Sequence, residues 1–532
     1  MKEDSVTHVE SGGDQVIQDE DIGTMKKDPA NATAAADDDD VALKLVDDAA
    51  PAQLSLAQTR RVTRKIDLYL MPLLIVTFML QYIDKILLSG AAQFGIVQDL
   101  HLYKVAGVNP KTHEPILNLH RYSNATLIFY WGCLAALLPA SYLVQRLPIG
   151  RYLSCTVIAW GVIIILTVVV GGYEGFMVQR FFLGVTECSV PLGCSLIVAM
   201  WWKRDEQPLR YAVWYTSQGL GGFFGFMLMY GIGHIHGRLH PWKYMYIILG
   251  SITVAWGALL FWLLPNNPVE ATFLKHDERV AAVERMRSEQ IGIENKRFKP
   301  YQVIEVLIDP KTWLFFIMTF SLQFINGAVS GFNTIIVNSL GYSHFQAVLI
   351  AGSLGAGVFV MCLVTGLLGT LIKNCRTWLL IITELLTILG ACLIWKLDWD
   401  TQRAGALFGF IFCGWFAACY TTVLALAFAN TSGHTKRAFT SGIIWCAWGI
   451  SNGVSPLTVK TTEVAQHYPT CFKAVVTTGA VTVVGGMVLR VYLQHQNRLR
   501  DRKYGIVDPQ TVTQAAFHDK TDNENTLFRY SL

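Results

Sequence analysis

Four charged residues lie inside long apolar runs of this sequence. Asp84 and Lys85 interrupt LMPLLIVTFMLQYIDKILLSGAAQFG, and Arg180 and Glu187 lie within FMVQRFFLGVTECSVPLGCSLIVAM. On insertion scales, each such residue at the centre of a bilayer costs roughly 2.5–3.5 kcal/mol, and ionisable residues placed there commonly mark the pathway of a substrate or an ion. We therefore expect a transporter whose chemistry is centred on these four positions.

The two acidic residues are candidates for carrying protons. A carboxyl group in apolar surroundings can bind and release a proton, because burial disfavours its ionised form while a nearby cation favours it. Asp84 and Glu187 are therefore the expected proton-coupling residues. An anionic substrate that competes for the neighbouring cation would couple its own movement to that of a proton. The alternative is a static ion pair that only satisfies its two partners.

The two basic residues are candidates for binding an anion. Arg180 and Glu187 are seven residues apart, so they lie on one face of a helix, about 10 Å apart along its axis. The planar guanidinium group binds a carboxylate at two points, which lysine cannot do. We predict Arg180 as the principal substrate anchor. Lys85 is a second substrate-binding candidate, or a switch that pairs with Asp84.

Uncharged polar residues in other apolar runs are expected to complete the cavity. Tyr82, Asn326 and Asn452 are the predicted substrate contacts of this kind, and each could instead only bridge two helices. Glu384 is an isolated carboxylate to which the sequence assigns no role. Further polar residues in the apolar runs are Tyr130, Gln218 and Gln323.

The composition is that of a membrane protein. Of the 532 residues, 52% are hydrophobic and only 15% are charged, whereas a soluble protein averages about 25% charged residues. The net charge of +4 is too small to suggest a nucleic-acid partner. The eleven cysteines form no C-x-x-C pair and are expected to be small packing residues. We expect no metal, no cofactor and no enzymatic activity, since no nucleophile–base or phosphate-loop pattern stands out.

Windows of about 20 apolar residues are long enough to cross a bilayer as helices. The sequence predicts an all-α membrane protein with twelve such helices, at 70–92, 122–144, 152–171, 175–200, 209–231, 243–264, 313–339, 346–372, 377–396, 404–428, 438–459 and 470–493. Glycines within these runs (Gly219, Gly221, Gly222, Gly225, Gly352, Gly355 and Gly357) are expected to permit close helix contacts rather than to bind a nucleotide.

Polar segments divide the chain into five parts. We expect a disordered acidic tail (1–55), a six-helix half (56–264), a central loop with an amphipathic helix (265–312), a second six-helix half (313–493) and a C-terminal tail (494–532). Lys and Arg concentrate in the segments that share one side of the membrane with both termini. Both termini and the central loop are therefore predicted to be cytoplasmic.

Several stretches, taken in order, resemble one family of transporters: QYIDKILLSGAA, RFFLGVTECSVP, WWKRDEQPLRYAVWYTSQGLGG, GHIHG, WKYMYIILG, LPNNPVEATFL, ERVAAVERMRSEQIGIENKRFKPYQ, NTSGHTKR and DKTDNENTLFRYSL. From about residue 56 onward the chain resembles the major facilitator superfamily, and more narrowly its anion:cation symporter family in the fungal allantoate-permease-like branch. It departs from the superfamily at Gln145, where an acidic residue is usual, and at Ser455-Pro456-Leu457, where many relatives carry Gly-Pro-Gln.

The resemblance implies a fold and a function. It implies two halves that rock about a site near the midplane, with Asp84 and Glu187 as proton carriers and Arg180 on the anion pathway. The implied substrates are small organic anions such as allantoate, ureidosuccinate, nicotinate, pantothenate or sugar acids. We expect a monomeric, proton-coupled importer that spans the lipid bilayer of the plasma membrane by alternating access. The alternatives are an exporter of an organic acid or secondary metabolite, and a membrane receptor or nutrient sensor.

Overall fold

The computed structural model describes residues 56–108, 115–203, 206–287, 299–372, 374–505, 521–526 and 528–532. The predicted acidic tail, part of the predicted central loop and part of the predicted C-terminal tail therefore lie outside the described residues. The described chain is helical, as predicted, apart from one antiparallel pair of strands, β1 (Lys104–Val108) and β2 (Pro115–Asn118).

The first group of long helices is formed by the part of the chain that precedes the central loop. Its helices are α2 (Leu56–Ala91), α4 (His120–Arg146), α5 (Ile149–Leu166), α6 (Tyr173–Glu187), α7 (Ser189–Trp201), α8 (Gln207–Gly233) and α9 (Pro241–Leu263). The short α3 (Ile96–Asp99) follows α2. α6 and α7 together form one candidate membrane span, Tyr173–Trp201, which corresponds to the predicted fourth helix.

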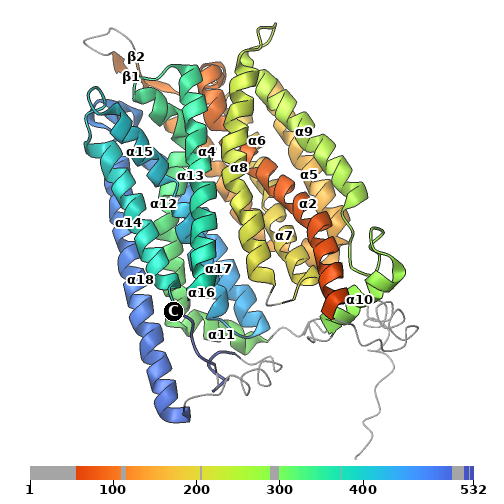
Figure 1. Ribbon diagram of the computed structural model, residues 1–532. Helices are drawn as coiled ribbons and strands as arrows, with labels where there is room; N and C mark the ends of the chain where they lie inside the picture. The colour runs from red at the N-terminus through yellow and green to blue at the C-terminus, as the bar shows by residue number, and fades with distance from the viewer. Residues whose placement is uncertain are drawn as a thin grey trace, which may run out of the picture. The chain divides into compact units, whose positions relative to one another are not determined.

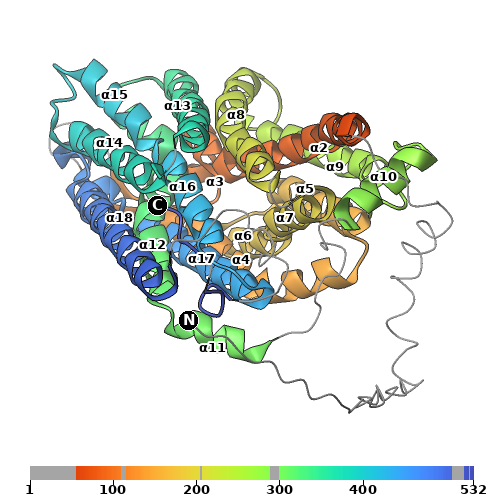
Figure 2. The same cartoon turned by 60° about the horizontal axis from the view of Figure 1, so that its bottom comes forward.

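The second group of long helices follows the central loop. Its helices are α12 (Pro310–Ser339), α13 (His344–Leu371), α14 (Arg376–Lys396), α15 (Arg403–Cys413), α16 (Phe416–Ala429), α17 (His434–Val454) and α18 (Pro469–Tyr504). Two shorter helices, α10 (His276–Arg287) and α11 (Pro300–Ile308), lie between the groups in the sequence. In Figures 1 and 2 the first group is coloured red to yellow-green and the second green to blue.

Ten of the described helical stretches are long and apolar enough to cross a membrane. They cover the predicted spans except the fifth and the eleventh. Helices α8 and α17 occupy the positions of those two spans, but they are not among the ten. The number of twelve spans therefore stays a prediction.

The two ends of the helix groups carry different features. Helices α10 and α11 lie at the lower end in Figure 1, where α2, α12 and α17 begin, and β1 and β2 lie at the opposite end. We call these the linker end and the hairpin end. Helix α10 contains much of the amphipathic segment predicted in the central loop, and it packs on α2. There Phe273, just before α10, stacks on Tyr69 with 4.0 Å between the ring centroids.

The two groups pack against each other closely along α8 and α13. A Cβ atom at Gly355 would lie 2.5 Å from the main-chain nitrogen of Phe223 and 2.7 Å from the carbonyl oxygen of Gly219. Side chains at these positions would therefore separate the helices. For Gly219 and Gly355, the prediction that these glycines permit close helix contact is confirmed. The contact holds the second helix group beside the first.

At the hairpin end, hydrogen bonds join the two groups. The Thr334 hydroxyl donates to the carbonyl oxygen of Ser89 over 2.5 Å, and the Tyr122 hydroxyl donates to the carbonyl oxygen of Gly331 over 2.7 Å. Because Ser89 and Tyr122 belong to the first group and the other two residues to α12, the helices are tied together at this end.

Candidate functional site

A cavity of about 790 Å³, including space open to solvent, lies between the two helix groups. Its lining comes from α2, α4, α6, α7 and α8 of the first group and from α17 of the second. The lining residues are Phe78, Gln81, Tyr82, Lys85, Phe129, Cys133, Leu134, Leu137, Glu187, Cys188, Pro191, Leu192, Tyr215, Gln218, Trp445, Trp448 and Gly449. Two of the four predicted charges, Lys85 and Glu187, are among them.

Lys85 is surrounded by aromatic rings. Its Nζ atom lies 5.8 Å from the ring centroid of Tyr82, 5.7 Å from that of Tyr130 and 5.5 Å from that of Trp448. It also donates a long hydrogen bond of 3.4 Å to Asn326 Oδ1. Such cation–π contacts each contribute roughly 0.5–2 kcal/mol. They hold the ammonium group in the cavity without neutralising its charge, so Lys85 remains able to bind an anion.

Glu187 owes its position to a break in the helix. Helix α6 ends at Glu187 and α7 begins at Ser189, and Pro191 lies four residues after Glu187. A proline has no main-chain N–H and its ring clashes with the carbonyl four residues earlier. The freed Glu187 carbonyl oxygen instead accepts a hydrogen bond of 3.1 Å from the Gln81 side chain. The carboxyl oxygen Oε1 of Glu187 has no hydrogen-bond partner among the described residues.

Asp84 and Arg180 are buried but do not line the cavity. Arg180 donates from Nη2 to the Tyr246 hydroxyl over 3.1 Å and lies 5.1 Å from the ring centroid of Phe176. Within the described part of the chain, Asp84 Oδ2 and Arg180 Nε lack hydrogen-bond partners. Asp84 interacts electrostatically with both Glu187 and Arg180. In this conformation Lys85, not Arg180, is the cation at the cavity surface, and the substrate role of Arg180 stays a prediction.

The two predicted asparagines support Lys85 from the second helix group. Asn326 donates to Gln323 Oε1 over 2.8 Å and accepts from Lys85. Asn452 donates to the same Gln323 oxygen over 3.4 Å and to the carbonyl oxygen of Trp448 over 2.8 Å. Neither asparagine lines the cavity. The structure therefore places them behind Lys85 and Trp448, while Tyr82 lines the cavity directly; substrate contact by any of the three stays a prediction.

Sequence reasoning did not single out several lining residues. Trp445 and Trp448 are the main ones, because they form the wall contributed by α17. Their rings lie 5.4 Å apart between centroids. The spacing of three residues, with Asn452 four residues further on, indicates one helix face, and this signal could have pointed to them.

Glu384 lies away from this cavity. It is buried in α14, and its Oε2 atom lacks a hydrogen-bond partner in the described residues. It is not among the lining residues. Nothing in its surroundings assigns it a role in the candidate site.

A cavity between two groups of membrane-spanning helices, with a lysine and a buried glutamate at its wall, is typical of secondary transporters. The family description "Major Facilitator Superfamily" matches residues 73–456. The chain belongs to this superfamily, and within it to the fungal allantoate-permease-like branch.

Curated relatives match the chain over most of its length. It is 30% identical to the allantoate permease of Saccharomyces cerevisiae over 93% of this chain and 90% of the relative. It is 28% identical to the thiamine pathway transporter of the same yeast, over 97% and 94%. An uncharacterized transporter of Schizosaccharomyces pombe is 32% identical over 89% and 87%.

Solved structures show the same fold. A bacterial homolog of the human lysosomal transporter Spinster, in an inward-facing conformation, has a TM-score of 0.58 at 12% identity and covers 82% of this chain and 97% of its own. The xylose transporter XylE from E. coli, partially occluded and inward open, has a TM-score of 0.58 at 12% identity, over 78% and 97%. At this identity the likeness concerns the fold alone.

Proposed function

We propose that this protein is a proton-coupled importer of a small organic anion, with Lys85 as the anion-binding cation and Glu187 as the proton carrier. The observation that carries the proposal is that both side chains line one cavity between the two helix groups. An anion bound at Lys85 would offset the positive field that Lys85 exerts on Glu187. Substrate binding therefore favours a proton on Glu187, and both are carried together.

Asp84 and Arg180 complete the charge arrangement in this proposal. Both are buried behind the cavity wall and both interact electrostatically with Glu187. Asp84 is proposed as the second proton-coupling residue, which exchanges its proton with Glu187. Arg180 is proposed to reach the anion in another state of the cycle. The termini and the linker end are proposed to face the cytoplasm, and the membrane is proposed to be the plasma membrane.

Allantoate is the first probe, because a relative at 30% identity carries it in its name; nicotinate and pantothenate follow. Uptake of the labelled probe is measured in proteoliposomes with and without an imposed pH gradient, acidic outside. Glu187→Gln is expected to abolish accumulation driven by the gradient and to retain exchange of labelled for unlabelled substrate. Glu384→Gln is the matched control, since it removes a buried carboxyl that lies outside the cavity.

The opposite result has a clear meaning. If the Glu187→Gln variant still concentrates the probe in response to the pH gradient, Glu187 does not carry the proton. If acidity outside drives the labelled probe out of loaded vesicles instead, the protein is an exporter. The orientation of the protein in the vesicles is determined from the access of a protease to the linker end. With the orientation known, the direction of transport distinguishes an importer from an exporter.

A further inference from the structure

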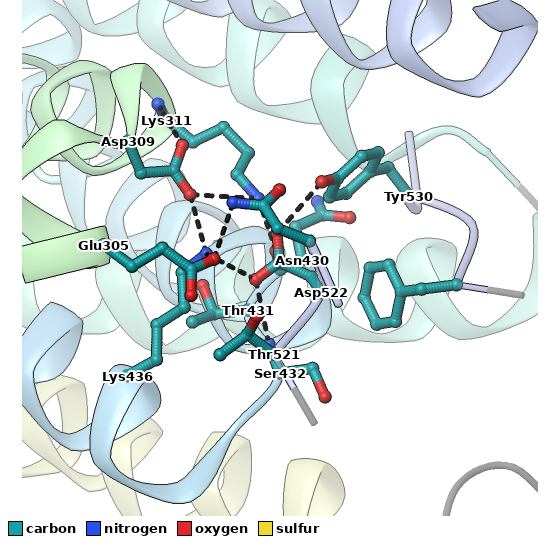
Figure 3. Close-up of polar contacts among 12 residues, drawn as sticks. Glu305, Asp309, Lys311, Asn430, Thr431, Ser432, Lys436, Thr521, Asp522 and Tyr530 are labelled. Carbon is teal, nitrogen blue, oxygen red and sulfur yellow. Dashed lines mark hydrogen bonds and ion pairs between the residues drawn. The ribbon is translucent and has the colours of Figure 1, made fainter. Parts of the chain in front are cut away.

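The last described residues lie at the linker end of the second helix group (Figure 1), where they contact residues of that group (Figure 3). We call the described residues 521–526 and 528–532 the C-terminal strap. Thr521 and Asp522 are 0% exposed, and Tyr530 is buried. A segment that extended from α18 into water would leave these three residues exposed, so their burial indicates that the segment is docked at these points.

Asp522 is the centre of the docked segment. One carboxyl oxygen forms an ion pair with Lys311, and the other forms an ion pair of 2.7 Å with Lys436. The Tyr530 hydroxyl also donates to Asp522 Oδ2 over 2.9 Å. The Lys311 and Lys436 side chains are 3% and 1% exposed. The carboxylate therefore bridges two buried ammonium groups that come from different helices.

The rest of the strap forms peptide-like hydrogen bonds with its surroundings. Asn430 donates to the carbonyl oxygen of Ser531 over 2.9 Å and accepts from its main-chain N–H over 2.7 Å. Asn497 makes the same two kinds of bond with Tyr530, at 2.9 and 2.8 Å. Arg500 donates to strap carbonyl oxygens, including that of Asp522 over 2.8 Å. Each asparagine side chain thus offers both a donor and an acceptor to the main chain of the strap, so the strap is held by its main chain as well as by Asp522.

The two lysines are also tied to the end of the central loop. Lys436 forms ion pairs with Glu305 at 2.8 Å and with Asp309 at 3.0 Å, and Lys311 lies 3.4 Å from Asp309. Figure 3 shows Asp522 among these groups. The cluster therefore joins α11, α12, α17 and the strap at one point.

The helices clamped at this point are those that support the cavity. Lys311 lies at the start of α12, which carries Asn326. Lys436 lies at the start of α17, which carries Trp448. Asn326 and Trp448 both contact Lys85. A shift between the linker ends of α12 and α17 would therefore also move Asn326 and Trp448 relative to Lys85.

We propose that the C-terminal strap is an intramolecular ligand of a two-lysine site and that its docking clamps α12 to α17 at the linker end. Asp522 is the anchor of this ligand. The strap thereby holds the α17 wall of the cavity in place. The proposal does not depend on which substrate the protein carries or on proton coupling.

The test separates folding from docking, because the full chain folds before the strap is cut. A protease site flanked by Gly-Ser spacers is inserted between positions 512 and 513, and the purified protein is cleaved in detergent. After cleavage the terminal fragment is expected to co-elute with the wild-type protein on size exclusion. In the Asp522→Asn protein it is expected to separate. Asp501→Asn, which removes the 2.7 Å ion pair between α18 and Arg529 of the strap, is the matched control and is expected to retain the fragment.

Hydrogen–deuterium exchange then tests the clamp. Loss of the fragment is expected to increase exchange at least several-fold in the first turns of α12 and α17, with little change in α5 and α9. Adding a synthetic peptide of residues 521–532 is expected to restore protection, and the same peptide with Asn in place of Asp522 is not. The proposal is overturned if the Asp522→Asn fragment stays bound as firmly as the wild-type fragment. It is equally overturned if the fragment leaves and exchange in α17 does not change.

Discussion

The side-chain amide of Gln81 donates a 3.1 Å hydrogen bond to the main-chain carbonyl oxygen of Glu187. This bond links α2 to the break between α6 and α7, at the wall of the cavity. The carbonyl is available because Pro191 offers it no N–H. The position of the carboxyl proposed to carry the proton is therefore set by a residue on another helix.

Gln81→Leu keeps the approximate volume of the side chain and removes the donor. Leaving a buried carbonyl unpaired costs about 1–3 kcal/mol, so we expect Glu187 to move and the rate of pH-driven uptake to fall about tenfold or more. Uptake is measured in proteoliposomes at fixed protein content. Gln402→Leu, at an exposed position, is the control, and equal rates in the two variants would contradict the role of Gln81.

Lys85 and the three aromatic rings around it, Tyr82, Tyr130 and Trp448, lead us to expect graded changes in KM when they are substituted. Lys85→Gln removes the cation and should raise the KM for the anion at least about tenfold, the equivalent of a charged hydrogen bond of about 1.5–3 kcal/mol. Trp448→Phe keeps an aromatic face and should change KM little, whereas Trp448→Ala should raise it several-fold. Initial uptake rates over a range of substrate concentrations measure each effect. An unchanged KM in Lys85→Gln would remove Lys85 from the substrate site.

The contact between α8 and α13 predicts opposite outcomes for two glycines of the same helix. Gly355→Ala places a methyl group against the main chain of Phe223, at 2.5 Å from its nitrogen, and main chain cannot give way as a flexible side chain can. We expect a loss of about 1–3 kcal/mol, as for other overpacked sites, and a lower Tm in detergent. At Gly366 nothing lies within 4 Å of the added Cβ, so Gly366→Ala should leave the Tm unchanged or slightly raised. Equal Tm values would contradict the close approach.

The stability that Asp522 contributes through the docked strap is expected to depend on pH. Burial raises the pKa of the Asp522 carboxyl, but the ammonium groups of Lys311 and Lys436 outweigh burial and hold that pKa below its ordinary value. A carboxyl whose pKa is lower in the folded protein stabilises it fully above the unfolded value of about 3.9, and this contribution is lost as the pH falls through the folded value. The other titratable groups next to Asp522 are Tyr530, Tyr492 and Arg500. Asp309 and Glu305 pair with the same two lysines.

The difference in Tm between the wild-type and Asp522→Asn proteins should therefore stay constant from pH 8 to about pH 5 and shrink only below about pH 4. Differential scanning fluorimetry in a series of buffers measures it. A difference that closes between pH 7 and pH 5 would show that the carboxylate is not held by the two lysines.

The four charges could be predicted because a charge in an apolar run is a local signal. Which of the four charges line the cavity could be predicted less well. Asp84 and Lys85 are neighbours whose side chains point about 100° apart on a helix, so the sequence alone does not tell which of them faces the cavity. That it is Lys85, while Arg180 pairs with Tyr246, depends on how the helices are rotated against each other, and no single stretch of sequence encodes that rotation.

Other features depended on contacts between distant parts of the chain. The sequence alone does not distinguish Trp448 from other apolar residues of a membrane span, because its contact with Lys85 forms only when the second helix group packs beside the first. The segment that contains Asp522 carries part of the family resemblance, but its sequence alone assigns it no role. Its partners Lys311 and Lys436 lie far from it along the chain, so only the folded structure shows what it binds.

The buried carboxylate of Asp522 also bears on how the protein is made. Lys311 and Lys436 are synthesised before Asp522, which follows Lys436 by 86 residues. Until the segment around Asp522 has been synthesised, the two-lysine site lacks this bridging carboxylate. The second helix group therefore reaches the charge balance of the folded protein only after Asp522 has been added, and a truncation before Asp522 would leave two buried ammonium groups without this partner at the linker end.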